Sequence, residues 1–377
     1  MVLATIICRQ GEKLLHLLFL EPFFGGSHKD FALGLQAHSA HDIELVTLPG
    51  IYWKWRMAGA ALEFLRQVPH FGRYDGIVVT DMMNLCDLIA LAGEPLPPVI
   101  LYFHENQVTY PVSRHERSSH YLGAVNLSSA LAADRVVFNS HYHKDAFLKG
   151  VAQFIQKCPD MNFSQRIDDI LLKSSVLYPG CFFSKKNGLS WEEKPQPPVI
   201  IWNHRWEHDK NPEPFFHALT VIKEKQIPFR LALLGERYPN IPDVFIEARE
   251  RFSQELVSYE FLESREAYYE WLAKGSIAVS TANQENFGIS MVEAARFGAI
   301  PLVPDRLSYP EIIPQACHES CVYQSQRDLI LKLETILTHP YHYKNISETL
   351  AGAMQDFAWS RVIASYDHLF ENTFRNL

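Results

Sequence analysis

The chain has 377 residues, of which 47% are hydrophobic and 21% charged, and its formal net charge is −8. These values exclude a disordered chain and a protein coated in positive charge, and the length predicts about two domains. Its six cysteines form no regular framework, which indicates a reducing compartment. No apolar run approaches the roughly 20 residues of a membrane span, and the amino end does not resemble a signal peptide, so we expect a cytoplasmic protein without membrane association.

Strand-like apolar runs alternate with helix-compatible segments along the first half of the chain. These runs are residues 14–20, 43–48, 76–80, 99–103, 135–139 and 176–178. A proline-rich stretch at 194–198 follows, and the pattern restarts with runs at 199–202, 230–234, 257–261, 277–280 and 300–303. The sequence therefore predicts an α/β protein with two doubly wound domains that face each other across a cleft, and a boundary near residues 185–197.

A glycine pair follows the first predicted strand, in the segment Glu21-Pro-Phe-Phe-Gly-Gly-Ser-His-Lys. Gly25 and Gly26 would let backbone amides approach a phosphate or a sugar ring, and His28 and Lys29 would add hydrogen-bond donors. The alternative is a tight strand-to-helix connection without a ligand.

Two tryptophans alternate with two cations in the segment Trp53-Lys-Trp-Arg, which we expect to be a loop. Trp55 would stack on a nucleic-acid base while Lys54 and Arg56 pair with phosphates. The alternative is a tryptophan pair that covers the core.

Polar side chains end the strand at 99–103, in the segment His104-Glu-Asn-Gln. His104 would hydrogen-bond a sugar hydroxyl, although a histidine satisfied within a loop is the alternative. Glu105 and Asn106 would either contact a ligand or brace this loop. After the next strand, Ser140 is expected to cap a helix that begins at His141.

The second half opens with a charged segment after its first strand, Trp202-Asn-His-Arg-Trp-Glu-His-Asp-Lys. Arg205 offers a bidentate fork and Lys210 a point charge, the pair that a diphosphate needs as its leaving charge develops. At the next strand end, Gly235 would permit close approach to a ligand, and Glu236 would accept a hydrogen bond.

Glu285 and Glu293 stand at a junction of strand, turn and helix. Gly288 allows the turn, and the apolar spacing of residues 289–297 predicts the helix. Glu285 then lies at a strand end and Glu293 one to two turns into the helix, beside free N–H groups that favour an anion. Such a pair suits a sugar nucleotide, whereas two solvated surface acids are the alternative.

Several motifs are missing from the sequence. There is no Asp-x-Asp to chelate a metal diphosphate and no His-Glu-x-x-His, so we expect metal-independent chemistry without a cofactor. A Gly-x-Ser-x-Gly elbow and a Walker lysine loop are also absent, which disfavours acyl and nucleoside triphosphate hydrolysis.

These segments resemble the tRNA-queuosine α-mannosyltransferase family, within the retaining GT-B glycosyltransferases of family 4. The resemblance covers nearly the whole chain and includes Phe24-Gly-Gly-Ser-His-Lys, Lys54-Trp-Arg, Tyr102-Phe-His-Glu-Asn-Gln, His204-Arg-Trp-Glu-His-Asp-Lys, Ser280-Thr-Ala and Tyr309-Pro-Glu-Ile. It implies a GT-B fold, with an acceptor domain at 1–190, a nucleotide-sugar domain at 198–356 and a last helix at 357–377 that crosses back to the first. Members transfer mannose from GDP-mannose to the cyclopentenediol of queuosine in tRNA-Asp, and no obligate protein partner is implied.

The resemblance also implies roles for individual residues. Arg205, Lys210, Glu285 and His104 would be catalytic. Donor contacts would come from Gly25, Gly26, Arg205, Lys210, Gly235, Glu236, Glu285, Phe287, Gly288 and Glu293. Acceptor contacts would come from His28, Lys54, Trp55, Arg56, Glu105 and Asn106.

A tRNA acceptor would require a basic face. The candidates for that face are Lys54, Arg56, Arg114, Arg117, Lys144 and Lys149. Two other functions stay open: transfer to a glycan or lipid acceptor, and a non-catalytic protein that binds a nucleotide sugar or RNA.

Overall fold

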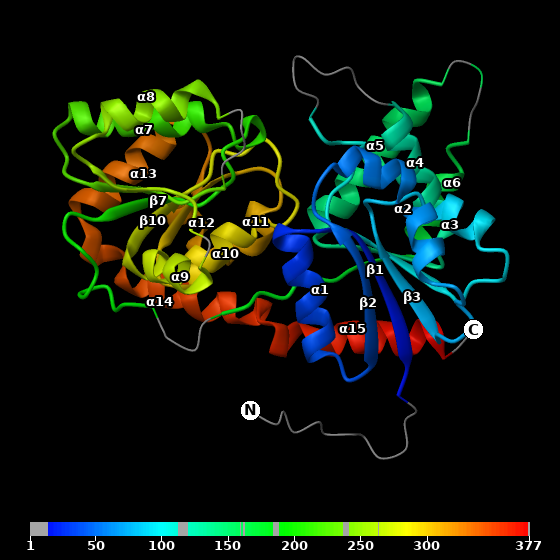
Figure 1. Ribbon diagram of the computed structural model, residues 1–377. Coiled ribbons are helices and arrows are strands. Elements are labelled where there is room, and N and C mark those ends of the chain that lie inside the picture. Colours follow the sequence, from blue (N-terminus) through cyan, green and yellow to red (C-terminus); the bar gives the residue numbers. More distant parts are fainter. Residues whose placement is uncertain are drawn as a thin grey trace. The chain divides into compact units, whose positions relative to one another are not determined.

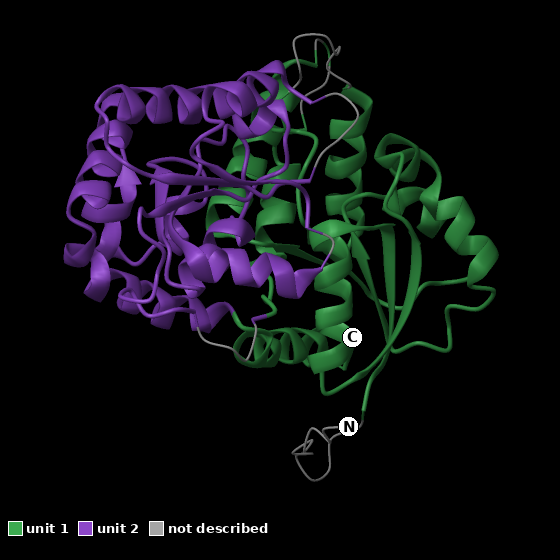
Figure 2. Ribbon diagram, turned by 60° about the vertical axis from the view of Figure 1, so that its left-hand side comes forward, with its two compact units in different colours: residues 1–182, 358–377 green, residues 183–357 purple. Residues whose placement is uncertain are grey.

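The computed structural model describes residues 14–111, 120–158, 160, 163–183, 188–236, 241–262 and 264–375. The chain divides into two compact units (Figures 1 and 2), and the described residues of each form an α/β domain on a parallel sheet. Unit 1 comprises residues 1–182 and 358–377, and unit 2 comprises residues 183–357. No helix of the described segments is both long and apolar enough to cross a membrane.

The unit 1 sheet has the strand order β2-β1-β3-β4-β5-β6, and neighbouring strands run parallel. Its strands are β1 (His16–Phe24), β2 (Asp42–Pro49), β3 (Gly76–Thr80), β4 (Val99–Phe103), β5 (Arg135–Phe138) and β6 (Ser174–Val176). These bounds confirm the first five predicted strands, although β1 continues four residues past the predicted end at Leu20, and β6 begins two residues before the predicted run at 176–178. Because the strands are parallel, their carboxyl ends share one edge of the sheet.

Helices cover both faces of this sheet. They are α1 (Gly26–His38), α2 (Trp53–Gln67), α3 (Leu85–Leu91), α4 (His120–Ala132), α5 (His141–Gln156), α6 (Arg166–Leu172) and α15 (Trp359–Phe374). Alternate residues of β1 face opposite ways: Leu17 packs with α1 and α15, whereas Leu18 packs with α2 to α6. The last helix therefore belongs to the core of unit 1, through Trp359, Tyr366 and Phe370.

The unit 2 sheet has the order β12-β11-β10-β7-β8-β9 and is also parallel. Its strands are β7 (Val199–Trp202), β8 (Arg230–Leu233), β9 (Leu256–Tyr259), β10 (Gly275–Val279), β11 (Ile300–Pro304) and β12 (Val322–Tyr323). The sequence predicted all of these except β12, which is too short to show a pattern.

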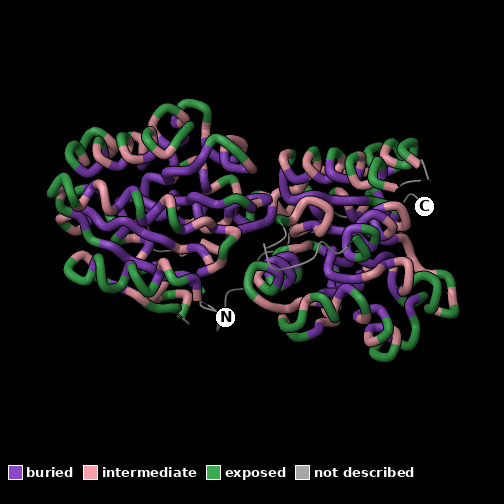
Figure 3. The backbone as a smooth tube through the Cα atoms, turned by 90° about the horizontal axis from the view of Figure 1, so that it is seen from above, coloured by how far each residue is buried: buried purple, intermediate pink, exposed green. Residues whose placement is uncertain are grey.

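Helices also cover both faces of the unit 2 sheet. They include α7 (Pro212–Glu224), α8 (Asp243–Arg251), α9 (Arg265–Lys274), α10 (Ile289–Arg296), α11 (Tyr309–Ile312), α12 (His318–Cys321), α13 (Gln326–Thr338) and α14 (Lys344–Ala353). Figure 1 shows α7, α8 and α13 on one face and α9, α10 and α14 on the other. Buried residues gather in the strands, and exposed residues lie on the outward sides of the helices (Figure 3).

Candidate active site

Lys210 lies at the carboxyl edge of the unit 2 sheet, in a 3-10 turn (η1, His208–Lys210) that follows β7. Its buried Nζ donates to the Gln284 carbonyl oxygen at 2.8 Å. The same nitrogen pairs with Asp209 at 3.1 Å and with Glu285 at 3.4 Å. Burial lowers the pKa of Lys210, but the carboxylates of Glu285 and Asp209 outweigh it and raise the pKa above its ordinary value. Lys210 is therefore a permanent cation at this strand end.

Arg205 supplies a second cation beside Lys210. Its guanidinium pairs with Glu207 at 3.2 Å and with Asp209 at 3.8 Å, and 41% of its side chain is exposed. Asp209 thus contacts both cations and holds them near each other. One buried and one exposed cation therefore lie at the same strand end, the arrangement expected for a diphosphate, and their role in donor binding stays a prediction.

Glu285 precedes a tight turn that leads into α10. Gly288 caps the helix with φ +101°, and a Cβ there would lie 3.0 Å from Ile312 Cδ1, so the turn needs glycine. The Ser308 hydroxyl donates to the Phe287 carbonyl oxygen at 2.9 Å, which fixes the loop. The Phe287 side chain itself is buried. Only backbone atoms of this residue are then suited to a ligand.

Glu293 lies in the second turn of α10, as predicted, and a network that the sequence did not reveal holds its carboxylate. The Tyr268 hydroxyl, from α9, donates to Glu293 Oε2 at 2.9 Å. Asn203 Nδ2 in turn donates to the Tyr268 oxygen at 3.0 Å and to the Ser290 carbonyl oxygen at 2.8 Å. Burial and the Glu293 charge raise the pKa of Tyr268 well above its ordinary value, so this phenol stays a donor.

Gly235 is required by a contact within the protein, and its predicted approach to a ligand stays a prediction. A Cβ at this position would lie 1.6 Å from the His204 carbonyl oxygen, so the glycine is needed for contact with the protein's own backbone. Glu236 is exposed, and its carbonyl oxygen accepts from the Trp206 amide at 3.0 Å. A role for Glu236 in donor binding stays a prediction.

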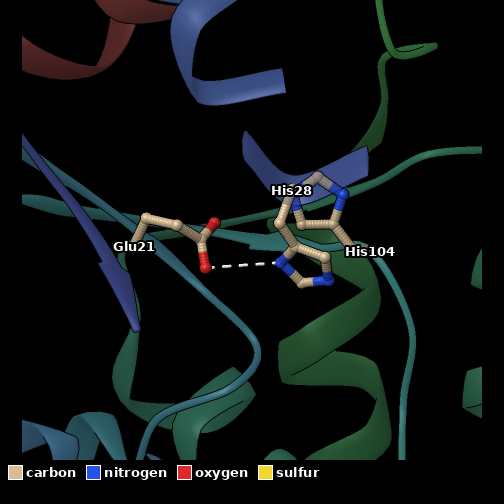
Figure 4. Close-up of side chains that lie close together, drawn as sticks. All are labelled: Glu21, His28 and His104. Carbon is tan, nitrogen blue, oxygen red and sulfur yellow. Dashed lines mark hydrogen bonds and ion pairs between the residues drawn. The ribbon is translucent and has the colours of Figure 1, made fainter. Parts of the chain in front are cut away.

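At the carboxyl edge of the unit 1 sheet, Glu21 is fully buried within β1. Its Oε1 accepts from the Phe23 amide at 2.8 Å and the Thr80 hydroxyl at 3.2 Å, and it lies 3.3 Å from His28 Nδ1 (Figure 4). Burial lowers the pKa of His28, but the charge of Glu21 outweighs it and raises the pKa to about 9. His28 is therefore a buried imidazolium.

His104 follows β4 and lies beside His28, with ring centroids 4.0 Å apart (Figure 4). Its amide donates to Asp81 Oδ1 at 2.8 Å, and its carbonyl oxygen accepts from Asn139 Nδ2 at 2.9 Å. Burial lowers the pKa of His104 well below its ordinary value, so its ring is neutral. Burial raises the pKa of Asp81 to about 8. Sequence reasoning gave no role to Asp81 or Glu21, although a carboxylate within a buried apolar strand is itself a signal.

Glu21, His28 and His104 also form a group that could hold a metal ion, since their ligand atoms lie within 4.8 Å of one another (Figure 4). Because the ion pair with Glu21 keeps His28 protonated, a metal would have to displace that proton. The metal independence of the chemistry stays a prediction.

Asn106 braces the loop that follows β4, which corrects its prediction as an acceptor contact. The side chain is fully buried, and its Oδ1 accepts from the amides of Val108 at 3.1 Å and Thr109 at 2.9 Å. Glu105, by contrast, is partly exposed and accepts from Gln107 Nε2 at 3.0 Å. Of this pair, only Glu105 can contact a ligand without a change in the loop.

The segment Trp53-Lys-Trp-Arg is the first turn of α2 and not a loop, which is a second correction. Trp53 is partly buried against the core, whereas Trp55 is 73% exposed. Arg56 Nε donates to the Pro49 carbonyl oxygen at 3.3 Å. Trp53 thus covers the core, as the alternative for the pair held, whereas the base-stacking role of Trp55 stays a prediction.

The remaining candidates for a basic face lie on α5 or outside the described residues. Lys144 is partly exposed and Lys149 is exposed on α5. Arg114 and Arg117 lie outside the described residues. Ser140 caps α5 as predicted, because its hydroxyl oxygen accepts from the His143 amide at 2.9 Å.

Comparison with known proteins gives matches in both units. A family model described as tRNA-queuosine alpha-mannosyltransferase N-terminal matches residues 16–181, and one described as Glycosyl transferases group 1 matches residues 185–350. A tRNA-queuosine alpha-mannosyltransferase of Drosophila melanogaster is 36% identical over 310 residues, which cover 80% of this chain and 82% of the relative.

Solved structures share the fold at low sequence identity. A sucrose-phosphate synthase from Thermosynechococcus elongatus aligns with a TM-score of 0.72 at 14% identity, covering 96% of this chain and 100% of that chain. The catalytic domain of starch synthase IV from Arabidopsis thaliana, bound to ADP and acarbose, aligns over the same shares with a TM-score of 0.70 at 13% identity. These likenesses show that the fold is that of the GT-B glycosyltransferases.

Proposed function

The chain belongs to the tRNA-queuosine alpha-mannosyltransferase family, and on this basis we propose that it transfers mannose from GDP-mannose to the cyclopentenediol of queuosine in tRNA-Asp. The family supports mannosyl transfer to queuosine in tRNA, and the group 1 match supports glycosyl transfer. The observation that carries the donor side is the cluster of Arg205, Asp209 and Lys210, because two cations at one strand end suit a sugar diphosphate.

The proposed reaction is a front-side displacement with retention of configuration, since mannose is α-linked both in GDP-mannose and in an α-mannoside. The bond from the anomeric carbon to the diphosphate oxygen breaks as the bond to the acceptor oxygen forms. The departing diphosphate takes the proton of the acceptor hydroxyl. Arg205 and Lys210 stabilise the charge that develops on the diphosphate, so catalysis is mainly electrostatic and positional.

The other donor contacts are assigned to α10 and the turn before it. Glu293 binds the ribose hydroxyls, and its support from Tyr268 fixes the carboxylate for this task. Glu285, with the backbone amides around Phe287 and Gly288, binds the mannose hydroxyls. No cofactor and no metal are needed in this scheme, because Arg205 and Lys210 neutralise the diphosphate.

Unit 1 supplies the acceptor side in this proposal. Neutral His104 holds the transferred sugar near its reacting carbon, and the buried imidazolium of His28 lies next to it. Glu105 contacts the acceptor, and Lys54, Trp55 and Arg56 contact the RNA around it. With tRNA as substrate, the reaction is placed in the cytoplasm.

The test is transfer of labelled mannose from GDP-mannose to purified tRNA-Asp that contains queuosine. The controls are queuosine-free tRNA, UDP-sugars, a chelator and Glu285→Ala. We expect label only in the queuosine tRNA, with or without the chelator, and none with the variant. Binding of GDP-mannose without any labelled tRNA would refute queuosine tRNA as the acceptor. If no sugar nucleotide binds, the proposed glycosyltransferase activity is refuted.

A further inference from the structure

Two aromatic side chains stand exposed at the start of α2. Tyr52 and Trp55 are each 73% exposed, the largest exposed fractions among the aromatic residues that the structure describes. The Trp55 amide donates to the Tyr52 carbonyl oxygen at 2.8 Å, so the two residues are one helical turn apart. Both rings therefore stand exposed at the start of the same helix, Tyr52 as its N-cap residue and Trp55 in its first turn.

Trp53, between the two exposed residues in the sequence, anchors the start of α2 to the core. The Trp53 ring packs against a buried cluster that includes Met57, Met82 and Leu122. Tyr52 itself has φ 55°, a left-handed conformation that is uncommon for a residue with a side chain. Such a conformation persists where the surrounding structure fixes it, and here it turns the Tyr52 ring outward.

The exposed pair lies next to the predicted acceptor site of the same unit. The turn before α2 crosses the turn before α1 at Gly50 and Gly25, where a Cβ on Gly50 would lie 2.8 Å from the Gly25 Cα atom. The turn at Gly25 leads directly to His28, whose ring lies against His104. The start of α2 is therefore adjacent to the turn that leads from Glu21 in β1 to His28 in α1.

The segment that carries the pair has basic but no acidic residues, although the whole chain is acidic. Residues 45–62 contain Lys54 and Arg56 but no aspartate or glutamate, in a protein of net charge −8. The Lys54 Nζ lies 5.3 Å from the centroid of the Trp53 ring, on the same turn of helix. A partner that brings flat rings and negative charge together fits this surface better than an apolar protein face.

We propose that Tyr52 and Trp55 form a stacking platform for unpaired bases of an RNA loop, with Lys54 and Arg56 on its phosphates. The inference rests on the proposed function and deepens it, because it names the surface that receives the nucleotides around the modified base. Tyr52 is a residue to which the family resemblance gave no role. Stacking tolerates any base, so the platform contributes affinity for the loop, while the queuosine itself sets specificity.

The test compares the full-length protein with Tyr52→Ala, Trp55→Ala and the double variant. The probe is the fluorescently labelled anticodon stem-loop of tRNA-Asp with queuosine, and its dissociation constant is measured by anisotropy. We expect each single variant to bind about tenfold more weakly and the double variant more weakly still. Trp55→Phe should keep most of the affinity, because it retains a ring. Lys54→Ala should flatten the salt dependence of binding.

The matched control is Tyr341→Ala, which removes an exposed tyrosine from unit 2 and should leave RNA binding unchanged. Leu62→Ala removes an exposed leucine from the same helix, two turns beyond Trp55, and should also have no effect. Thermal melting and GDP-mannose binding verify that each variant is folded with an intact donor site. Unchanged RNA affinity in the double variant would overturn the platform. Loss of affinity in Leu62→Ala equal to that in Trp55→Ala would also overturn it, since it indicates a general apolar contact.

Transfer assays separate this inference from the proposed function. The unmodified protein, whose platform is intact, must transfer mannose to queuosine tRNA. If it does not, the proposed function is refuted. If it does, the double variant should lose kcat/KM for the stem-loop but transfer mannose to free queuosine nucleoside at the normal rate. Equal losses on both acceptors would overturn the platform and leave the function standing.

Discussion

Each unit carries charged groups at the carboxyl edge of its own sheet. The charges of the buried groups at the two edges have opposite signs, and so do their counter-ions. In unit 2 the central group is a cation, Lys210, held between Asp209 and Glu285, and its raised pKa keeps it charged at every physiological pH. In unit 1 the buried acids are Glu21, which pairs with the His28 imidazolium, and Asp81, whose pKa of about 8 leaves it largely protonated at neutral pH.

This difference affects what each edge can do. The pKa values of Asp81 and His28 are about 8 and about 9, so the charge of the unit 1 edge changes in a range where that of Lys210 does not. A permanent cation suits an anionic diphosphate, whereas a titratable edge suits neutral hydroxyl groups that exchange hydrogen bonds. In the proposed reaction, unit 2 would then supply electrostatic stabilisation and unit 1 hydrogen bonds.

The largest effect should come from removing the permanent cation. In Lys210→Ala we expect kcat to fall by about 100-fold, because a strong charge-stabilising donor contributes about 3 kcal/mol to a transition state. Mannose transfer from GDP-mannose is the measurement. Lys223→Ala is the matched control, since Lys223 also pairs with a carboxylate of unit 2, Glu255 at 2.9 Å, but away from the site. Turnover within a few-fold of normal would refute the role of Lys210.

The second effect is a loss of stability at alkaline pH. The pKa of Asp81 rises from its ordinary value of 3.8 to about 8 in the folded chain. Its contribution to the free energy of unfolding therefore falls as pH rises from about 4 to about 8. The raised pKa of His28 likewise lowers the stability of the fold as pH rises from 6.5 to about 9. The melting temperature should therefore fall between pH 7 and 9.

Asp81→Asn should flatten this dependence, because the amide oxygen can still accept from His104 but no longer titrates. Asp134→Asn is the control: Asp134 is exposed, accepts from the Val99 amide at 2.7 Å and lies in the same unit. An alkaline slope in Asp81→Asn as steep as in the unmodified protein would contradict the assignment of that slope to Asp81.

The sequence predicted the parts of the site that depend on local pattern. Glu285, Gly288 and Glu293 could be placed because strand, turn and helix follow one another without a gap, and each leaves a signature of period or composition. The first turn of α2 was wrongly predicted to be a loop. Its N-cap residue is Tyr52, whose side chain makes no capping hydrogen bond, so the sequence lacks the Ser, Thr, Asp or Asn that usually indicates a helix start.

The missing parts depend on contacts between distant positions. Tyr268 reaches Glu293 across 25 positions, and Asp81 reaches the His104 amide across 23, so neither pairing leaves a periodic trace in the sequence. Asn106 was ambiguous for the same reason, because burial decides between a brace and a ligand contact. Packing of separate elements, not local propensity, determined these residues.

Tyr268 gives a smaller and more selective prediction for unit 2. In Tyr268→Phe the Glu293 carboxylate loses its donor, and we expect the KM for GDP-mannose to rise about 5- to 10-fold, which corresponds to about 1 kcal/mol, the net contribution of one ordinary hydrogen bond. The kcat should stay near normal, because the ribose lies away from the breaking bond. Tyr341→Phe removes an exposed hydroxyl of the same unit and should change neither constant. A fall in kcat with unchanged KM would contradict a role in positioning Glu293.

The smallest expected effect concerns a serine N-cap that occurs in both units. Ser140 caps α5 in unit 1 and Ser325 caps α13 in unit 2, and each side chain accepts from the amide three residues later. Ser140 is fully buried, whereas Ser325 is exposed. After substitution by alanine, water can replace the lost acceptor at α13 but not at α5. We therefore expect Ser140→Ala to cost about 2 kcal/mol of unfolding free energy and Ser325→Ala about 1 kcal/mol or less, measured by urea denaturation. Equal costs would show that water reaches the start of α5 as readily as that of α13.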